Sequence, residues 1–185
     1  STILRFLDRG VQGIIVPHIN TKSQAESVAN AARYHPNGNR GVGGGRVHDY
    51  GINTTRAESI KFVNDNILVI PMIEEVEAIK NVNEIASVEG VDVLHVAPGD
   101  LGQSMGNPPQ AEIREAMDKV IPKIRRAGRW VGVGGNSPGE VERVSDLINL
   151  GANMITIAAQ GLMKNGAESF RKSVEDHLRK TSLFD

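Results

Sequence analysis

Three times along this chain, a glycine opens a short apolar run rich in β-branched residues. The runs begin at Gly10, Gly90 and Gly151. Each glycine suits the left-handed position that commonly ends a helix. Each run hardly alternates with polar residues, which is typical of a strand covered on both faces in a parallel sheet. Residues 67–73 and 130–133 have the same character. The sequence therefore predicts a parallel β-sheet.

Helical patterns separate these runs, so strand and helix alternate. Capping boxes are expected from Ser23 to Glu26 and from Ser137 to Glu140, each with a hydroxyl followed three residues later by a glutamate. The predicted fold class is α/β, in one domain that covers residues 1–185. Helices are predicted near residues 23–34, 55–63, 76–88, 111–127, 138–150 and 167–180.

Strict alternation of strand and helix permits a doubly wound open sheet or a closed barrel. Dinucleotide binding in a doubly wound sheet needs a glycine-rich turn that leads from a strand into a helix. The glycine run from Gly41 to Gly45 continues into Arg46-Val-His-Asp-Tyr50 instead. Dinucleotide binding is therefore weakly supported, and the run is interpreted as a flexible loop or as backbone that approaches a ligand or a neighbouring subunit.

Composition excludes several classes of protein. Lys and Arg total 21 against 22 Asp and Glu, so no net charge favours nucleic acid or an anionic membrane. The chain has no cysteine, which excludes disulfides, thiolate metal sites and a cysteine nucleophile. Because no stretch is long enough to span a bilayer and residues 1–9 do not resemble a signal peptide, a soluble cytoplasmic protein is expected. The chain starts without Met within an expected helix, so further residues are expected upstream.

Two carboxylates follow predicted strands directly. Glu74 comes straight after residues 67–73, and Asp100 follows the strand that ends near Val96. In an α/β barrel, functional groups gather where the strands end. Neighbouring parallel strands lie roughly 4.8 Å apart, so the two carboxylates can share one small cation such as Mg²⁺ or Mn²⁺. The alternative is that Glu74 caps a helix and Asp100 stabilises a turn.

Several co-linear motifs resemble the HpcH/HpaI aldolases, a family of metal-dependent class II pyruvate aldolases. The resemblance implies a TIM (β/α)8 barrel of the phosphoenolpyruvate/pyruvate type, with Glu74 and Asp100 as ligands of Mg²⁺ or Mn²⁺, or alternatively Co²⁺ or Zn²⁺. It also implies that backbone amides near Gly43, Gly44, Gly99 and Asp100 approach the substrate carboxylate. The motifs are Met72-Ile-Glu-Glu-Val-Glu-Ala-Ile-Lys-Asn81, Val88-Glu-Gly-Val-Asp-Val93, Ala97-Pro-Gly-Asp-Leu101 and Arg33-Tyr-His-Pro-Asn-Gly-Asn-Arg-Gly-Val-Gly43.

The resemblance further implies cleavage of a 4-hydroxy-2-oxo acid to pyruvate and an aldehyde, and the reverse addition. The five predicted strands correspond to the fourth to the eighth of the barrel, so the first three strands are expected to be lacking here. The family's catalytic histidine and arginine belong to that part, and the catalytic residues are therefore expected upstream of Ser1. Met72 and Gly102 depart from the family's usual glutamine and serine.

Two alternatives to this aldolase remain open. One is a citryl- or malyl-CoA-type lyase, although no basic cluster for the CoA phosphates is visible. The other is an inactive, truncated homologue that binds metal and 2-oxo acids. Family members assemble as homo-oligomers, usually trimers of dimers, which implies an exchange of the helix near residues 166–180.

The remaining candidates have competing interpretations. His18 follows a strand end and is either a site residue or a loop residue, whereas His95 lies inside a strand and is expected to be a hydrogen-bonded core imidazole. Arg40 and Arg46 flank the glycine run and are expected to meet a substrate carboxylate or a neighbouring subunit. Trp130 is expected to anchor packing at the amino ends of the strands. Loop or surface positions are expected for His35, His48 and His177, and room for substrate is expected around Gly134 and Gly135.

Overall fold

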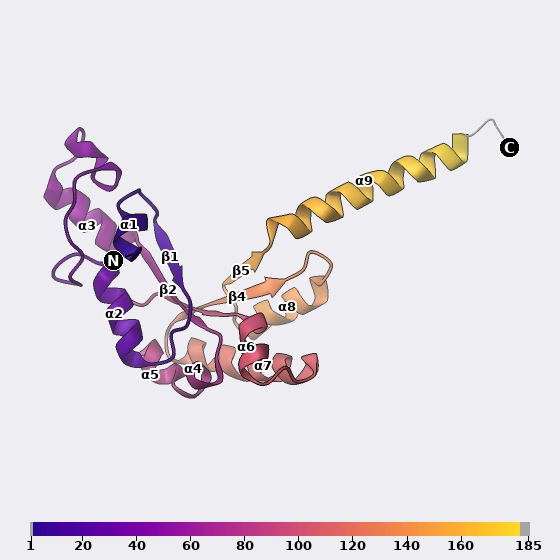
Figure 1. The fold of residues 1–185 in the computed structure, drawn as a ribbon, viewed down its shortest axis with the longest axis horizontal. Helices are drawn as coiled ribbons and strands as arrows, with labels where there is room; N and C mark the ends of the chain where they lie inside the picture. The colour runs from indigo at the N-terminus through magenta and orange to yellow at the C-terminus, as the bar shows by residue number, and fades with distance from the viewer. Residues whose placement is uncertain (1, 182–185) are drawn as a thin grey trace.

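The structure, a computed structural model, describes residues 2–181. A five-stranded parallel sheet lies at its centre, with the strands arranged in chain order (Figure 1). A doubly wound sheet reverses its strand order, whereas sequential order is that of a barrel, so the predicted barrel architecture is confirmed for these five strands. They are β1 (Gly13–Val16), β2 (Leu68–Ile73), β3 (Val93–Val96), β4 (Trp130–Asn136) and β5 (Met154–Ile157).

Helices connect the strands and cover the convex face of the sheet. The predicted helix at 76–88 is two short helices, the predicted 167–180 is part of a longer one, and α6 was not predicted. The elements are α1 (Thr2–Leu7), α2 (Lys22–Ala32), the 3-10 helix η1 (Arg46–Gly51), α3 (Arg56–Asn66), α4 (Val76–Lys80), α5 (Val82–Ala86), α6 (Pro98–Ser104), α7 (Gln110–Arg126), α8 (Val141–Leu150) and α9 (Ala159–Thr181).

Two helix starts differ from the predicted capping boxes. The N-cap of α2 is Thr21, whose side chain accepts from the amide of Gln24, while the Gln24 side chain accepts from the amide of Thr21. The prediction of Ser23 as the cap was wrong, because Thr21 forms the same reciprocal pair two residues earlier. The Ser137 amide does donate to Glu140 at 3.0 Å, but α8 starts only at Val141.

The core lies between the outer face of the sheet and the helices. On β2, β3 and β4, the outward-facing Val69, Leu94 and Val131 are each 0% exposed. On the inner face, the first residues of β2 and β4 are open to solvent, with Leu68 45% and Trp130 55% exposed. Trp130 begins β4 at the expected amino end, with the guanidinium of Arg125 5.0 Å from its ring centre.

The segment 33–43 of the family motif has a packing role in this structure. Arg33 is buried and donates from Nη1 to the carbonyl of Asn64 at 2.6 Å, and from Nη2 to Asp92 at 2.7 Å. Arg40 pairs with Asp8 at 2.9 Å and its guanidinium lies 4.6 Å from the ring centre of Tyr34. Arg40 therefore has a partner within its own chain, and these contacts tie the loop after α2 to the amino ends of the strands.

The last helix, α9, extends away from the rest of the molecule (Figure 1). None of its described residues is buried. Its sequence still carries large apolar side chains at spacings of four and seven residues, which place them on one side of a helix. Across residues 2–181, no helix combines the length and apolar character needed to cross a membrane.

Candidate active site at the carboxyl ends of the strands

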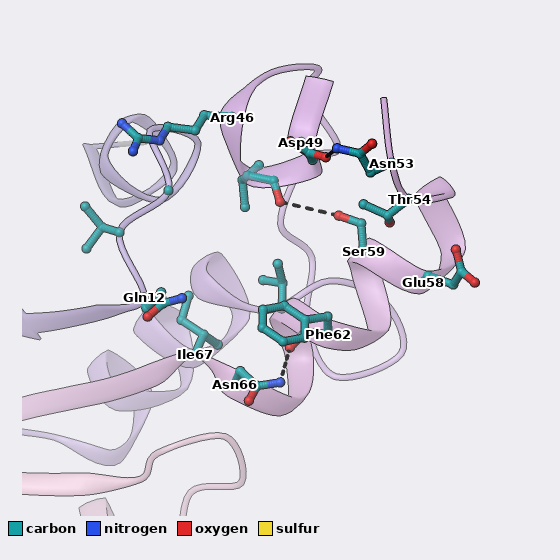
Figure 2. Close-up of a pocket in the computed structure, with 14 residues that line it drawn as sticks. Gln12, Arg46, Asp49, Asn53, Thr54, Glu58, Ser59, Phe62, Asn66 and Ile67 are labelled. Atoms are coloured by element: carbon teal, nitrogen blue, oxygen red, sulfur yellow. Dashed lines mark hydrogen bonds between the residues drawn. The ribbon is translucent and has the colours of Figure 1, made fainter. Parts of the chain in front are cut away.

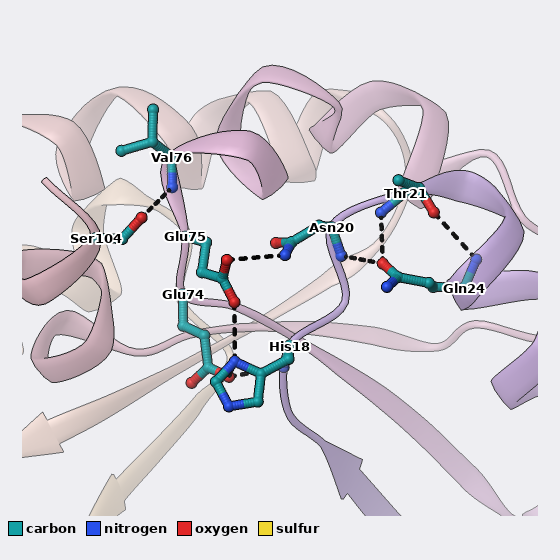
Figure 3. A network of polar contacts seen from close by, with 8 residues as sticks. All are labelled: His18, Asn20, Thr21, Gln24, Glu74, Glu75, Val76 and Ser104. Carbon is teal, nitrogen blue, oxygen red and sulfur yellow. Dashed lines mark hydrogen bonds and ion pairs between the residues drawn. The ribbon is translucent and has the colours of Figure 1, made fainter.

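Glu74 follows β2 directly, and its carboxylate is enclosed by the protein. The residue is 1% exposed. Its Oε1 accepts a 2.7 Å hydrogen bond from the amide of His18, whereas Oε2 receives none from residues 2–181 (Figure 3). No Lys or Arg of the described chain pairs with it. Since an enclosed carboxylate is unfavourable without compensating charge, this position suits a bound cation.

His18 joins the end of β1 to this carboxylate. Its φ of 58° lies in the left-handed region, and its backbone faces Glu74 while its ring faces Glu75 (Figure 3). Nδ1 lies 2.8 Å from Glu75 Oε1 and 3.5 Å from Glu74 Oε1. The hydrogen bond to Glu75, followed by the charge of Glu74 and more weakly that of Asp100, raises the pKa of His18. The structure therefore brings His18 into the site.

Glu75 is a site residue that the sequence did not reveal. It is the N-cap of α4, and its side chain makes no capping hydrogen bond. Its Oε2 instead accepts from Asn20 Nδ2 at 2.9 Å. The hydrogen bonds from His18 and Asn20 lower the pKa of Glu75. The available signal was the tandem of two glutamates after a strand, opposite a loop that contains His18 and Asn20.

Asp100 lies in the first turn of α6, where a simple turn was expected. Its carboxylate is exposed and has no hydrogen bond or ion pair with residues 2–181. Its charge contributes to the raised pKa of His18, which places it on the same side of the sheet as Glu74. A Cβ built on Gly99 meets nothing within 4 Å. The first amides of a helix lack intrahelical partners, so those of Gly99 and Asp100 are available to an anion.

The two carboxylates fit a hard divalent cation. Both are oxygen donors without a Lys or Arg partner, and Mg²⁺ is commonly held by one or two carboxylates plus waters and substrate. Within the described chain, no group of three or more His, Asp or Glu is arranged to hold a metal ion. A cation held by Glu74 and Asp100 alone would keep its other coordination positions for water and a chelating ligand.

The glycine run from Gly41 to Gly45 lies near the amino ends of the strands, away from Glu74. A Cβ on Gly43 would lie 3.3 Å from Asp8, which precedes β1, and Gly44 is the next residue. Arg46 lines a cavity of about 790 Å³ at the amino end of β1, between η1 and α3 (Figure 2). Glu74 follows the carboxyl end of β2. The structure thus does not bring Gly43 and Gly44 together with Glu74, and their contact with a substrate carboxylate remains a prediction from the family resemblance.

Three further predictions concern buried or crowded positions. His95 is buried as expected, at 4% exposed, but its Nδ1 has no hydrogen-bond partner in the described chain. His48 was interpreted as a loop residue and is instead buried in η1, where its ring contacts Tyr34 and Ser59. Gly102 is closely packed, since a Cβ there would lie 2.7 Å from Ile113 Cδ1.

Comparison with known proteins agrees with this arrangement. Residues 1–163 match the family model described as HpcH/HpaI aldolase/citrate lyase. A 2-keto-3-deoxy-L-rhamnonate aldolase of Shigella sonnei (strain Ss046) is 31% identical over 178 residues, which make up 90% of this chain and 62% of that protein. A hydroxypyruvate/pyruvate aldolase of Pseudomonas aeruginosa is 35% identical over 136 residues, 72% of this chain and 50% of that protein.

A solved structure supports the fold assignment independently. The HpcH/HpaI aldolase from Desulfitobacterium hafniense DCB-2 superposes with a TM-score of 0.80 at 26% identity, covering 99% of this chain and 70% of that one. The chain spans 62% and 50% of the two curated relatives. Glu74 and Asp100 both fall within the matched region. By sequence and by fold, this chain belongs to the HpcH/HpaI aldolase/citrate lyase family.

Proposed function

We propose that the protein is a metal-dependent aldolase that cleaves a 4-hydroxy-2-oxo acid to pyruvate and an aldehyde, and catalyses the reverse addition. The observation that carries this proposal is the buried carboxylate of Glu74, which lacks a Lys or Arg partner at the carboxyl end of β2. Two relatives that are named as aldolases support it. Glu74 and Asp100 are the proposed ligands, with Mg²⁺ or Mn²⁺ as the expected ion.

Backbone amides and side chains of this chain have further roles in the proposed site. A metal held by Glu74 and Asp100 would supply positive charge against the negative charge that develops on the substrate during cleavage. The amides of Gly99 and Asp100 receive the substrate carboxylate, which suits the positive end of a helix. The amide of His18 fixes Oε1 of Glu74, and Glu75 holds the His18 ring at the edge of the site. No residue between 2 and 181 is assigned here as the catalytic base.

Retro-aldol assays test this function. Turnover of a 4-hydroxy-2-oxo acid is measured with Mg²⁺ or Mn²⁺, with EDTA, and after metal is restored. Activity is expected to disappear with EDTA and return with metal. The variants Glu74→Gln and Asp100→Asn are expected to lower kcat/KM by at least about a hundredfold, because losing one charge-stabilising group commonly costs 10²–10³ in rate. Glu77→Gln, on the exposed side of α4, is the matched control and is expected to retain activity.

Activity that persists in EDTA would contradict the metal role, and so would full activity in Glu74→Gln. The family description also includes citrate lyases, which makes a citryl- or malyl-CoA-type lyase the second candidate. Cleavage of such a thioester to acetyl-CoA and a 2-oxo acid, without cleavage of 4-hydroxy-2-oxo acids, would favour that candidate. Metal-dependent binding of pyruvate without turnover of either substrate would indicate a non-catalytic binding protein.

We also infer that residues 1–185 act as one domain, in the cytoplasm, as part of a homo-oligomer. The apolar side chains of α9 support the last inference, because a helix that buries nothing in its own chain leaves them in water. The exposed ones include Met163 at 74%, Phe170 at 73% and Leu178 at 60%. A trimer of dimers in which α9 packs on a neighbouring copy accounts for this exposure.

A further inference from the structure

The two adjacent glutamates after β2 have different partners. Glu74 is buried, and only its Oε1 accepts a hydrogen bond from residues 2–181, from the amide of His18 at 2.7 Å. Both oxygens of Glu75 are occupied, because Oε1 lies 2.8 Å from His18 Nδ1 and Oε2 accepts from Asn20 Nδ2 at 2.9 Å (Figure 3). Glu75 is therefore not free to bind a cation, whereas Glu74 keeps one unpartnered oxygen.

Glu75 fixes the loop that follows β1. His18 and Asn20 lie two residues apart in this loop, and both bond to its carboxylate. Asn20 Oδ1 is buried and has no hydrogen-bond partner in the described chain, so the side-chain amide is oriented for Glu75 alone. The backbone of Asn20 donates to Gln24 Oε1 at 2.7 Å and accepts from Asn81 Nδ2 at 2.8 Å. The loop is thus held through its side chains and its backbone.

The backbone conformation of His18 connects Glu75 to Glu74. The φ angle sets the direction of an amide relative to its own side chain, and the φ of 58° at His18 is uncommon for a residue other than glycine. In this conformation the amide reaches Glu74 while the ring reaches Glu75 (Figure 3). Such a conformation persists where surrounding contacts hold it. The contact between the ring and Glu75 therefore helps to keep the amide on Oε1 of Glu74.

This hydrogen bond limits how Glu74 can meet a cation. The hydrogen of the His18 amide is positively polarised and already lies against Oε1, so it disfavours a cation that contacts both oxygens. The side chain is 1% exposed, and Oε2 is the oxygen that remains available. Asp100 is exposed and has no partner in the described chain, so it imposes no fixed geometry. The fit of the ion therefore depends on Glu74.

We propose that Glu75, held by His18 and Asn20, is a positioning residue that makes Glu74 bind its cation through one oxygen, so that the site selects Mg²⁺ or Mn²⁺ over Ca²⁺. This proposal rests on the metal-dependent function proposed above. Mg²⁺ requires near-ideal octahedral geometry and is commonly held by one or two carboxylates with several waters. Ca²⁺ takes about six to eight oxygens in flexible geometry, and its carboxylates can bind through both oxygens. A fixed carboxylate with one available oxygen suits Mg²⁺ better.

Competition against Mn²⁺ measures this preference without relying on turnover. The full chain is loaded with Mn²⁺, and displacement by Mg²⁺ or Ca²⁺ is followed by the electron paramagnetic resonance signal of the released ion. The wild type is expected to bind Mg²⁺ at least about tenfold more tightly than Ca²⁺. In Glu75→Gln and Asn20→Ala this ratio is expected to fall to within about twofold, because loss of a group that orients a metal ligand commonly lowers affinity by about 10–100-fold.

Glu77→Gln, which removes an exposed charge from the first turn of α4, is the matched control and is expected to keep the wild-type ratio. Both ions carry the same charge, so the loss of one negative charge weakens their binding together. Only a change in the ratio therefore reports on the positioning of Glu74. If Glu75→Gln binds no Mn²⁺, Asn20→Ala and His18→Phe, which keep Glu75, decide the question.

An unchanged ratio in these variants would overturn the positioning role of Glu75. A wild type that binds Ca²⁺ as tightly as Mg²⁺ would overturn the selectivity. Absence of Mn²⁺ binding to the wild type would instead overturn the metal-dependent aldolase, and the positioning role with it.

Discussion

Among single residues, Glu74 stands out because its carboxylate is buried, and a buried charge is unfavourable unless a cation lies beside it. Its carboxylate is enclosed and receives one hydrogen bond, from the amide of His18. The nearest cationic group is the His18 ring, at 3.5 Å, and that ring also binds Glu75. Removal from water penalises the charge of Glu74, whereas a divalent cation compensates for it. A divalent cation bound by Glu74, as proposed, is therefore expected to stabilise the folded protein.

Thermal unfolding measures this effect directly. At a metal concentration near one hundred times Kd, binding adds about 2.7 kcal/mol to the free energy of unfolding. For a domain of this size the melting temperature is expected to rise by about 5–10 °C. Glu74→Gln and Asp100→Asn are expected to abolish the rise, and Glu77→Gln to keep it. An equal rise in all four proteins would show that the stabilising metal binds somewhere else.

The three histidines with perturbed pKa values differ in the direction of the change. Glu75 and Glu74 raise the pKa of His18, whereas burial lowers that of His48 and of His95. For a histidine with a lowered pKa, the unfolded chain takes up a proton at a higher pH than the folded protein. Its contribution to stability is complete above the unfolded value of 6.5 and is lost as the pH falls below it.

His48 allows this predicted loss of stability at low pH to be tested away from the proposed metal site. Its ring lies between Tyr34 and Ser59, and burial followed by the charges of Arg40 and Arg56 lowers its pKa. The wild type is expected to exceed His48→Gln in melting temperature at about pH 7.5, and this advantage is expected to shrink toward about pH 5.5. An advantage that grows on acidification would mean that His48 gains a proton more readily when folded.

At the level of elements, the first residue of a helix depends on which nearby side chain accepts a hydrogen bond from the free backbone amides. The segment before α2 offers both Thr21 and Ser23 as hydroxyl caps, and sequence spacing alone favoured the wrong one. Only Thr21 has the extended backbone of an N-cap, with φ −133° and ψ 158°. Likewise α6 was not predicted, because Pro98-Gly99-Asp100 is equally compatible with a turn. Local patterns therefore located α2 without fixing its first residue, and they did not reveal α6.

Paired alanine substitutions distinguish the two candidate caps. Thr21→Ala removes the hydroxyl that accepts from the Gln24 amide and is expected to lower the free energy of unfolding by about 1 kcal/mol. Ser23→Ala changes an exposed residue of the first turn and is expected to stay within about 0.5 kcal/mol of the wild type. Denaturant melts of both variants give the comparison. A larger loss in Ser23→Ala would restore the cap that the sequence favoured.

For the whole molecule, the repeated passage from glycine to strand predicted three of the five strands, because each repeat carries its own helix end and buried run. The apolar runs at residues 67–73 and 130–133 predicted the other two. The resemblance placed Glu74 and Asp100 at one end of the sheet. Neither source predicted that His95 lies opposite Gly132, since register depends on how strands pair. Nor did they predict that Gly43 lies beside Asp8, since a glycine-rich loop carries no pattern that fixes its direction.

The exposed side of α9 leads to a prediction about assembly. Met163, Phe170, Val174 and Leu178 recur at spacings that place them along one stripe, and all are at least 41% exposed. A stripe of this kind on a helix of 23 residues is expected to pack against another copy of the chain. Light scattering after gel filtration is expected to give a mass that is a multiple of 20.0 kDa.

Substitutions on the two sides of α9 test whether this stripe causes the assembly. Phe170→Asp and Leu178→Asp place charges within the stripe, where burial against a partner would leave them unpaired. They are expected to shift the protein toward smaller species, with the effect largest when both are combined. Lys172→Asp introduces the same charge outside the stripe and is expected to keep the wild-type mass. Secondary structure is expected to be preserved in each variant, because no described residue of α9 is buried in its own chain. A wild type that runs as a single 20.0 kDa chain would exclude this interface.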